Sequence, residues 1–249
     1  MFKFKSVLFI FVFLTFSLQG VNYQHVDNEE GSSAANDILN FARGNQEFKD
    51  LHFKQHEREF VRMVHEGQSP RTLFIGCSDS RIVPDLILGT RPGDLFVIRT
   101  AGNFVPSYNA EGGDAVGGTL QYAVEVLNVR HIVVCGHNHC GAIKGLYQNL
   151  DENRFGLVKR WLRNGEEAKQ LTMQTVGPNL SKEELYRATE EISILYQLKH
   201  LLTYPFVKKR VQEGTLDLHG WYNNIETGEV EYYDINANKF VPLRNLVRR

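Results

Sequence analysis

The sequence predicts an α/β protein with a central, mostly parallel β-sheet flanked by α-helices. Three short apolar segments, at residues 72–77, 94–98 and 131–135, have the length and composition of strands buried on both faces. Apolar residues recur at helical spacing over residues 113–128, which predicts a helix between the second and third strands. This order is typical of a parallel sheet with right-handed crossovers, so we expect reactive residues at the carboxyl ends of the strands.

The composition indicates a folded protein with a sizeable core and a nearly neutral surface. Of the 249 residues, 42% are hydrophobic, and 28 basic residues face 29 acidic ones for a net charge of -1. This balance argues against a nucleic-acid partner, which would require a basic surface. The three cysteines are too few for a disulfide framework, so they are candidates for metal ligands, a nucleophile or core residues.

The first 20 residues have the pattern of a signal peptide. Lys3 and Lys5 precede an apolar run at residues 6–16, which is shorter than the ~20 residues that a membrane-spanning helix needs. We therefore expect cleavage near residue 20, export to the periplasm or the exterior, and no stable membrane insertion afterwards. An uncleaved membrane anchor is the alternative. Residues 21–35 are polar and predict a flexible linker.

The remainder, residues 36–249, is predicted to form one domain. Apolar residues at helical spacing over residues 36–65, interrupted at residues 44–45 by Gly-Asn, predict two amphipathic helices. Near the other end, residues 215–225 and 229–235 flank a Glu-Thr-Gly turn and predict a β-hairpin, or a final strand with a short partner.

Two further helices are predicted before that hairpin. They cover residues 154–163 and 181–202. The second opens with Ser181 and has Glu184 three residues later, which is the spacing of a capping box. We expect Pro205 to end this helix.

Two cysteines and one histidine follow the predicted strands at the positions where a metal site can form. Cys77 closes the first strand, and His137 and Cys140 follow the third. Two thiolates and one imidazole suit Zn²⁺, and three protein ligands leave one position open, as in catalytic zinc sites. The alternative is that these cysteines are ordinary core residues, as we expect of Cys135 inside its strand. We expect His139 to point away from the metal, either into solvent or toward a ligand that it supports.

Asp79 and Arg81 lie just beyond the first cysteine. A guanidinium can clamp a carboxylate through two charge-assisted hydrogen bonds and keep it ionised. Such a carboxylate can accept a proton from a metal-bound water or orient that water. The alternative is a plain surface salt bridge.

Together these motifs resemble those of the β-class carbonic anhydrases. The resemblance is found in residues 77–81, Cys-Ser-Asp-Ser-Arg, and residues 136–141, Gly-His-Asn-His-Cys-Gly. The similarity extends from residues 68–70 to about residues 219–221. The resemblance, which is to exported bacterial members, implies a zinc enzyme that interconverts CO2 and bicarbonate. It also implies one zinc per subunit and a homodimer or homotetramer, with N-terminal helices that pack on a dimer partner.

The resemblance also assigns roles to individual residues. It implies that zinc-bound hydroxide attacks CO2, with the Asp-Arg pair as the catalytic dyad. The implied zinc ligands are Cys77, His137 and Cys140, the dyad is Asp79 and Arg81, and the implied substrate-binding residues are Gln68, Phe96, Tyr122 and Gly141.

One departure from some bacterial members concerns regulation. Their non-catalytic bicarbonate site uses Trp, Arg and Tyr, whereas the matching positions here are Phe74, Arg99 and Asn223. In the closed state of such members the residue matching Asp79 is a fourth zinc ligand. We expect no such bicarbonate site here and an open resting site.

Two other functions are alternatives at this point. The same scaffold can hydrolyse carbonyl sulfide or carbon disulfide. A non-catalytic module with structural zinc would require four protein ligands.

Overall fold

The computed structural model describes residues 33–176 and 180–248, and the chain divides into two compact units between Glu57 and Arg58. The predicted signal peptide and all but the last three residues of the predicted linker lie outside the described residues. The described residues thus form a helical N-terminal unit and a larger unit that contains the sheet. Within the described ranges, we find no helix with the length and apolar character needed to cross a membrane.

The N-terminal helices are continuous where a break was predicted. Helix α1 (Ser33–Glu47) runs through Gly44 and passes into a π-helix (Phe48–Phe53) and then α2 (Lys54–Glu66). The irregularities lie later, in the π-helix and at a kink at His56. A single glycine costs a helix only about 1 kcal/mol, which explains why Gly44 does not end α1.

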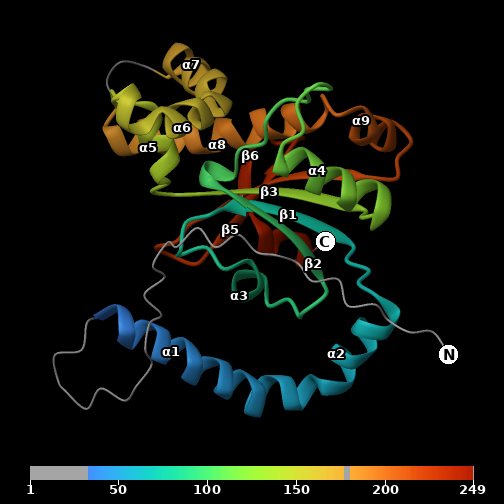
Figure 1. Ribbon diagram of the computed structural model, residues 1–249. Coiled ribbons are helices and arrows are strands. Elements are labelled where there is room, and N and C mark those ends of the chain that lie inside the picture. The colour runs from blue at the N-terminus through green and yellow to red at the C-terminus, as the bar shows by residue number, and fades with distance from the viewer. Residues whose placement is uncertain (1–32, 177–179, 249) are drawn as a thin grey trace, which may run out of the picture. The chain divides into compact units, whose positions relative to one another are not determined.

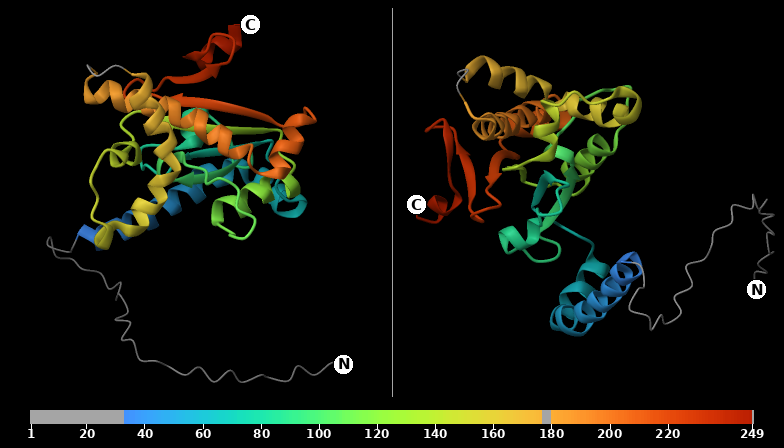
Figure 2. Two further views of the ribbon diagram at one scale, coloured as in Figure 1. Left: turned by 90° about the horizontal axis from the view of Figure 1, so that it is seen from above. Right: turned by 90° about the vertical axis from the view of Figure 1, so that its left-hand side faces the viewer.

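The larger unit is built on a six-stranded sheet with the order β2-β1-β3-β4-β5-β6. The strands β2, β1, β3 and β4 pair in parallel. Strand β5 pairs antiparallel with β4, and β6 pairs antiparallel with β5. Figure 2 shows β5 and β6, in red, together at one side of this unit. The strands are β1 (Thr72–Cys77), β2 (Leu95–Thr100), β3 (His131–His137), β4 (Asp217–Asn223), β5 (Val230–Asp234) and β6 (Lys239–Pro242). The predicted mostly parallel sheet and the hairpin of β4 and β5 are confirmed, whereas β6 was not predicted.

Helices cover both faces of the sheet in the larger unit (Figure 1). One face packs against α4, α8 and α9, where Ile194 of α8 is completely buried among residues of β1 and β3. The other face carries a smaller cluster of Phe74, Val133 and Cys135 against Leu88 of α3. The helices are α3 (Pro84–Leu88), α4 (Ala115–Gln121), α5 (Gly141–Leu146), α6 (Glu152–Leu162), α7 (Glu166–Thr175), α8 (Lys182–Leu201) and α9 (Pro205–Gln212).

The ends of α8 show one correct and one incorrect prediction. The Ser181 hydroxyl accepts a hydrogen bond from the N–H of Glu184, and the Glu184 carboxylate accepts one from the N–H of Ser181, so the capping box is confirmed. The helix ends at Leu201, and Pro205 begins α9 instead of ending α8. Proline suits this first position because its missing N–H would have no partner there.

Strand β2 differs from its prediction as a fully buried strand. It lies at the end of the strand order, so only one of its edges is paired within the described chain. Val97, in the middle of this strand, is 37% exposed. A continuous apolar sequence is typical of a buried strand, but it does not specify whether the strand has a neighbour on one edge or on both.

Candidate metal centre

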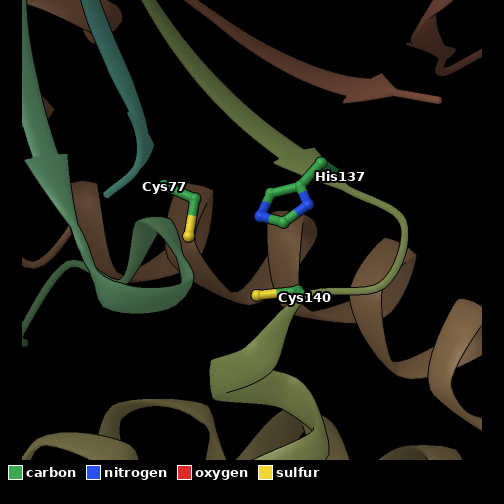
Figure 3. A group of neighbouring side chains, drawn as sticks. All are labelled: Cys77, His137 and Cys140. Carbon is green, nitrogen blue, oxygen red and sulfur yellow. The ribbon is translucent and has the colours of Figure 1, made fainter. Parts of the chain in front are cut away.

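The three predicted metal ligands come together at the carboxyl edge of the parallel strands. Cys77 is the last residue of β1, His137 is the last residue of β3, and Cys140 directly precedes α5. All three are buried, and their ligand atoms lie within 4.8 Å of one another. Figure 3 shows both sulfur atoms and the imidazole converging on one point. The parallel pairing of β1 with β3 brings these strand ends together.

The imidazole of His137 is oriented to present one nitrogen to this point. Its Nδ1 lies 2.8 Å from the carbonyl oxygen of Asn138, so Nδ1–H donates there and Nε2 carries the lone pair. Nε2 is buried and has no hydrogen-bond partner in the described protein. A buried polar atom without a partner is costly, and a metal ion would satisfy it. The donor set therefore fits a zinc ion.

The surroundings of Cys77 favour its thiolate. Its Sγ accepts hydrogen bonds from the backbone N–H groups of Asp79 (3.4 Å) and Gly102 (3.3 Å). Hydrogen bonding from the Cys140 thiol, with a smaller contribution from these N–H groups, lowers the pKa of Cys77 well below its usual range. The hydrogen bond that the Cys140 thiol donates to Cys77, together with burial and the nearby Cys77 charge, raises the pKa of Cys140. A divalent cation offsets this charge.

Asp79 and Arg81 form the predicted pair. The Arg81 guanidinium donates to both Asp79 carboxylate oxygens, at 2.9 Å and 2.7 Å, and the Arg81 backbone N–H donates at 3.0 Å. These bonds hold the pKa of Asp79 far below its ordinary value. Asp79 Oδ2 lies 4.0 Å from His137 Nε2, and Asp79 does not belong to the three-residue ligand group. The carboxylate thus stands beside the ligand point.

Arg99 holds the backbone that carries this pair. Its guanidinium donates to the carbonyl oxygens of Cys77 (3.0 Å) and Asp79 (2.6 Å). Phe74 and Asn223, at the other two positions compared with the bicarbonate site, are both buried. Arg99 therefore has a structural role that the sequence did not reveal.

Glu190 of α8 is a supporting residue that sequence reasoning missed. One carboxylate oxygen accepts from the backbone N–H of Cys140 (3.0 Å), and the other accepts from the Tyr222 hydroxyl (2.8 Å). Burial raises the pKa of Glu190, although both hydrogen bonds act in the opposite direction. The available signal was helical spacing, because Glu190 shares the buried face of α8 with Ile194 and Gln197.

The loop between the second and third ligands is held by contacts to the β4–β5 turn. The Asn138 side chain accepts from the N–H of Ile225 (2.7 Å). His139 has a positive φ of 57°, and its Nε2 lies 3.0 Å from a carboxylate oxygen of Glu226. His139 is thus directed to the surface and away from the ligand point. Cys135 is buried inside β3, as predicted, and burial raises the pKa of its thiol to about 12.

The predicted substrate-binding residues lie in different places within this chain. Gly141 follows Cys140 directly, and a side chain there would meet no heavy atom within 4 Å. Phe96 and Tyr122 stack on each other, with ring centroids 5.9 Å apart. Gln68 precedes β1 and Phe96 is near the start of β2, whereas Cys77 ends β1. In this chain, Gln68 and Phe96 therefore lie toward the amino ends of the strands, away from the ligand point.

The fold and the site define an α/β protein whose candidate metal centre lies at the carboxyl edge of a parallel sheet. A family model described as carbonic anhydrase matches residues 72–230. A carbonic anhydrase of Synechocystis sp. is 44% identical over 199 residues, which are 80% of this chain and 72% of that relative. The chain therefore belongs to the β-class carbonic anhydrases.

Solved structures agree with this assignment. The β-carbonic anhydrase CcaA superposes with a TM-score of 0.79 at 42% identity, covering 83% of this chain and 99% of that one. A tetrameric β-carbonic anhydrase from Sordaria macrospora superposes with a TM-score of 0.71 at 27% identity, covering 79% and 96%. The resemblance seen in residues 77–81 and 136–141 is thus confirmed at the level of the family and the fold.

Proposed function

We propose that this carbonic anhydrase hydrates CO2 reversibly at one zinc ion per subunit, held by Cys77, His137 and Cys140. The observation that carries the proposal is the buried, unpartnered Nε2 of His137 directed at two cysteine sulfurs. Two thiolates and one neutral imidazole match the soft ligands that zinc prefers, and a three-ligand set leaves a position for substrate chemistry.

The protein residues prepare this site for proton transfer and for positioning. At such a site, zinc would supply Lewis-acid activation of water near neutral pH. The hydration of CO2 is the best-known reaction that uses this chemistry. Arg81 keeps the Asp79 carboxylate ionised and fixes its direction. An ionised, oriented carboxylate beside the ligand point can accept a hydrogen bond or a proton from the nucleophile.

We infer that a second copy of the chain completes the substrate pocket. Gln68, Phe96 and Tyr122 lie away from the ligand point of their own chain, and Tyr122 is half-exposed and stacks on Phe96 of the edge strand β2. A homodimer across this side would cover Val97 and Tyr122 and can deliver such residues to the partner's site. The N-terminal helices, whose Phe41 is 70% exposed, supply further apolar surface for a partner. The assembly proposed is a homodimer or a homotetramer.

Zinc content measured together with CO2 hydration tests the catalytic proposal. We expect Cys77→Ala to lose both zinc and activity, while Cys135→Ala, which alters a core cysteine, keeps both. A fully active, zinc-free Cys77→Ala protein would contradict the proposal. Zinc-loaded protein that hydrolyses carbonyl sulfide but does not hydrate CO2 would assign the site to the alternative substrate.

Mixed subunits test the shared pocket. Gln68→Ala and Asp79→Asn chains should each be weakly active alone. If Gln68 serves the partner's site, a mixed dimer of the two variants contains one site that has both defects and one that has neither. Mixing should then restore about a quarter of the wild-type activity in a random dimer population, whereas no recovery would place Gln68 in its own subunit's site.

We propose further that the protein is exported by a bacterial cell, to the periplasm or the exterior, after removal of residues 1–20. The support is Lys3 and Lys5 ahead of the short apolar run. Cell fractionation with mass determination of the mature N-terminus tests this. Full-length chain in the cytoplasmic fraction would contradict it.

A further inference from the structure

A second group of potential metal ligands lies at the opposite ends of the strands. His131 is the first residue of β3 and Asp217 is the first residue of β4, while His219 lies two residues further along β4. His131 pairs with Asp217 in the parallel register, and alternate residues of β4 share one face. The three side chains thus project from the same face of two neighbouring strands.

The distances within this group match those between ligands of one metal ion. His219 Nε2 lies 3.3 Å from His131 Nδ1, and His131 Nδ1 lies 3.5 Å from Asp217 Oδ2. One potential ligand atom from each of the three residues lies within 4.8 Å of the other two. Two ligands that are each about 2.0–2.1 Å from a tetrahedral ion are separated by about 3.3–3.4 Å. An ion can therefore be accommodated with only small side-chain adjustments.

We propose that His131, Asp217 and His219 form a second, separate site for a divalent transition-metal cation. Two imidazoles and one carboxylate form a donor set of the kind that binds zinc and other first-row metals. His131 and His137 stand at opposite ends of β3, and its length places the second site about 20 Å from the first. The site is therefore independent of the catalytic ligands and of the function proposed for them.

The site is accessible, and its carboxylate is available to a cation. His131 and Asp217 line a cavity of about 550 Å³, and their side chains are 42% and 67% exposed. Arg210 also lines the cavity, but its guanidinium donates to the carbonyls of Val124 (2.9 Å) and Thr215 (2.8 Å). Arg210 is thus engaged by backbone oxygens and forms no ion pair with Asp217 in the described part of the chain. Water from the cavity can supply the remaining ligand.

Equilibrium dialysis of the full chain against ZnCl2 tests the proposal. Wild-type protein should bind one more zinc ion per chain than either Asp217→Asn or His219→Gln, whatever the occupancy of the cysteine site. Zinc addition should also raise the midpoint of thermal unfolding of the wild type more than that of the variants, because a ligand bound to the native state stabilises it.

Matched controls separate this site from general histidine binding. His65→Gln removes an exposed histidine of α2 and should retain the wild-type zinc stoichiometry. CO2 hydration should be unchanged in Asp217→Asn and His219→Gln, because the site is remote from the first ligands. Equal stoichiometry in the wild type and both variants would overturn the proposal. So would loss of one zinc ion in His65→Gln.

Discussion

The Glu190 carboxylate accepts a hydrogen bond from the backbone N–H of Cys140 at 3.0 Å, across 50 residues of sequence. A side chain in the middle of α8 thereby fixes the backbone of a residue of the candidate metal centre. Tyr222 donates to the other carboxylate oxygen, so α8 joins the ligand loop to β4. Residues such as Glu190 orient metal ligands without touching the metal.

Replacing Glu190 should therefore affect both stability and metal retention. Glu190→Ala leaves the Cys140 N–H and the Tyr222 hydroxyl without their acceptor, and each buried unsatisfied group costs about 1–3 kcal/mol. We expect a correspondingly lower free energy of unfolding in urea and faster loss of zinc to a chelator. Glu190→Gln keeps one acceptor oxygen and should be less affected. An alanine variant as stable as the wild type would show that water replaces the carboxylate.

The pair of Asp79 and Arg81 should be required for turnover but not for zinc binding. Asp79→Asn removes the ionised acceptor, and Arg81→Lys replaces the two-point clamp with a single donor group. A positioned proton acceptor contributes about 10²–10⁴-fold to rate. We expect kcat to fall within that range for Asp79→Asn, and less for Arg81→Lys, with unchanged zinc content. Arg91→Lys, at an exposed ion pair with Glu59, is the control and should be fully active.

After removal of the metal, Cys77 and Cys135 should differ in how fast their thiols are alkylated. Burial raises the pKa of Cys135 to about 12, whereas hydrogen bonds from Cys140 and the neighbouring N–H groups lower the pKa of Cys77. In folded, chelator-treated protein under reducing conditions, iodoacetamide should modify Cys77 well before Cys135. Peptide mass spectrometry reads out the order of modification. Faster labelling of Cys135 would contradict the assignment of this residue to the core.

Gly220 provides a test of packing between β4 and α8. A Cβ at this position would lie 2.9 Å from Ile194 Cγ2, so Gly220→Ala should destabilise the protein by about 1–3 kcal/mol. Ile194→Ala should cost about 2–5 kcal/mol because it leaves a cavity. The double variant should lose less stability than the sum, since the added methyl enters the space vacated.

The control for this packing test is Gly118→Ala. A Cβ at Gly118 in α4 would meet no heavy atom within 4 Å. This variant should be neutral or slightly stabilised, because alanine favours a helix more than glycine does. Additive effects in the Gly220 and Ile194 double variant would contradict the predicted contact.

Tyr204 should make stability fall at alkaline pH. Burial, with the charge of Asp114 adding to it, raises the pKa of this phenol to about 12 in the folded protein, whereas an unfolded tyrosine ionises near pH 10. The unfolded chain therefore loses this proton first, so stability is present below about pH 10 and declines up to about pH 12. Tyr204→Phe should show a shallower decline than the wild type. Tyr108→Phe, at the exposed ring in edge-to-face contact with Tyr204, is the matched control and should retain the wild-type slope.

Much of the fold and the ligand set could be predicted because the relevant patterns are local. The runs that form β1 and β3 end directly at Cys77 and His137, and the parallel order brings such ends together. The capping box of α8 was likewise visible within four residues. The edge position of β2 could not be predicted, because it depends on the order of all the strands in the sheet.

The sequence by itself determined the class of fold and pointed to Cys77, His137 and Cys140 as candidate metal ligands and to Asp79 and Arg81 as a pair, since short motifs at the ends of predicted strands carry these residues. Only the tertiary structure showed that Glu190 supports Cys140, that Arg99 holds the backbone of Cys77, and that β4 brings His219 to His131. These contacts join residues 22 to 88 positions apart. Such contacts depend on which strands and helices pack together. Local periodicity predicts where a helix or strand forms, but not which other elements it contacts.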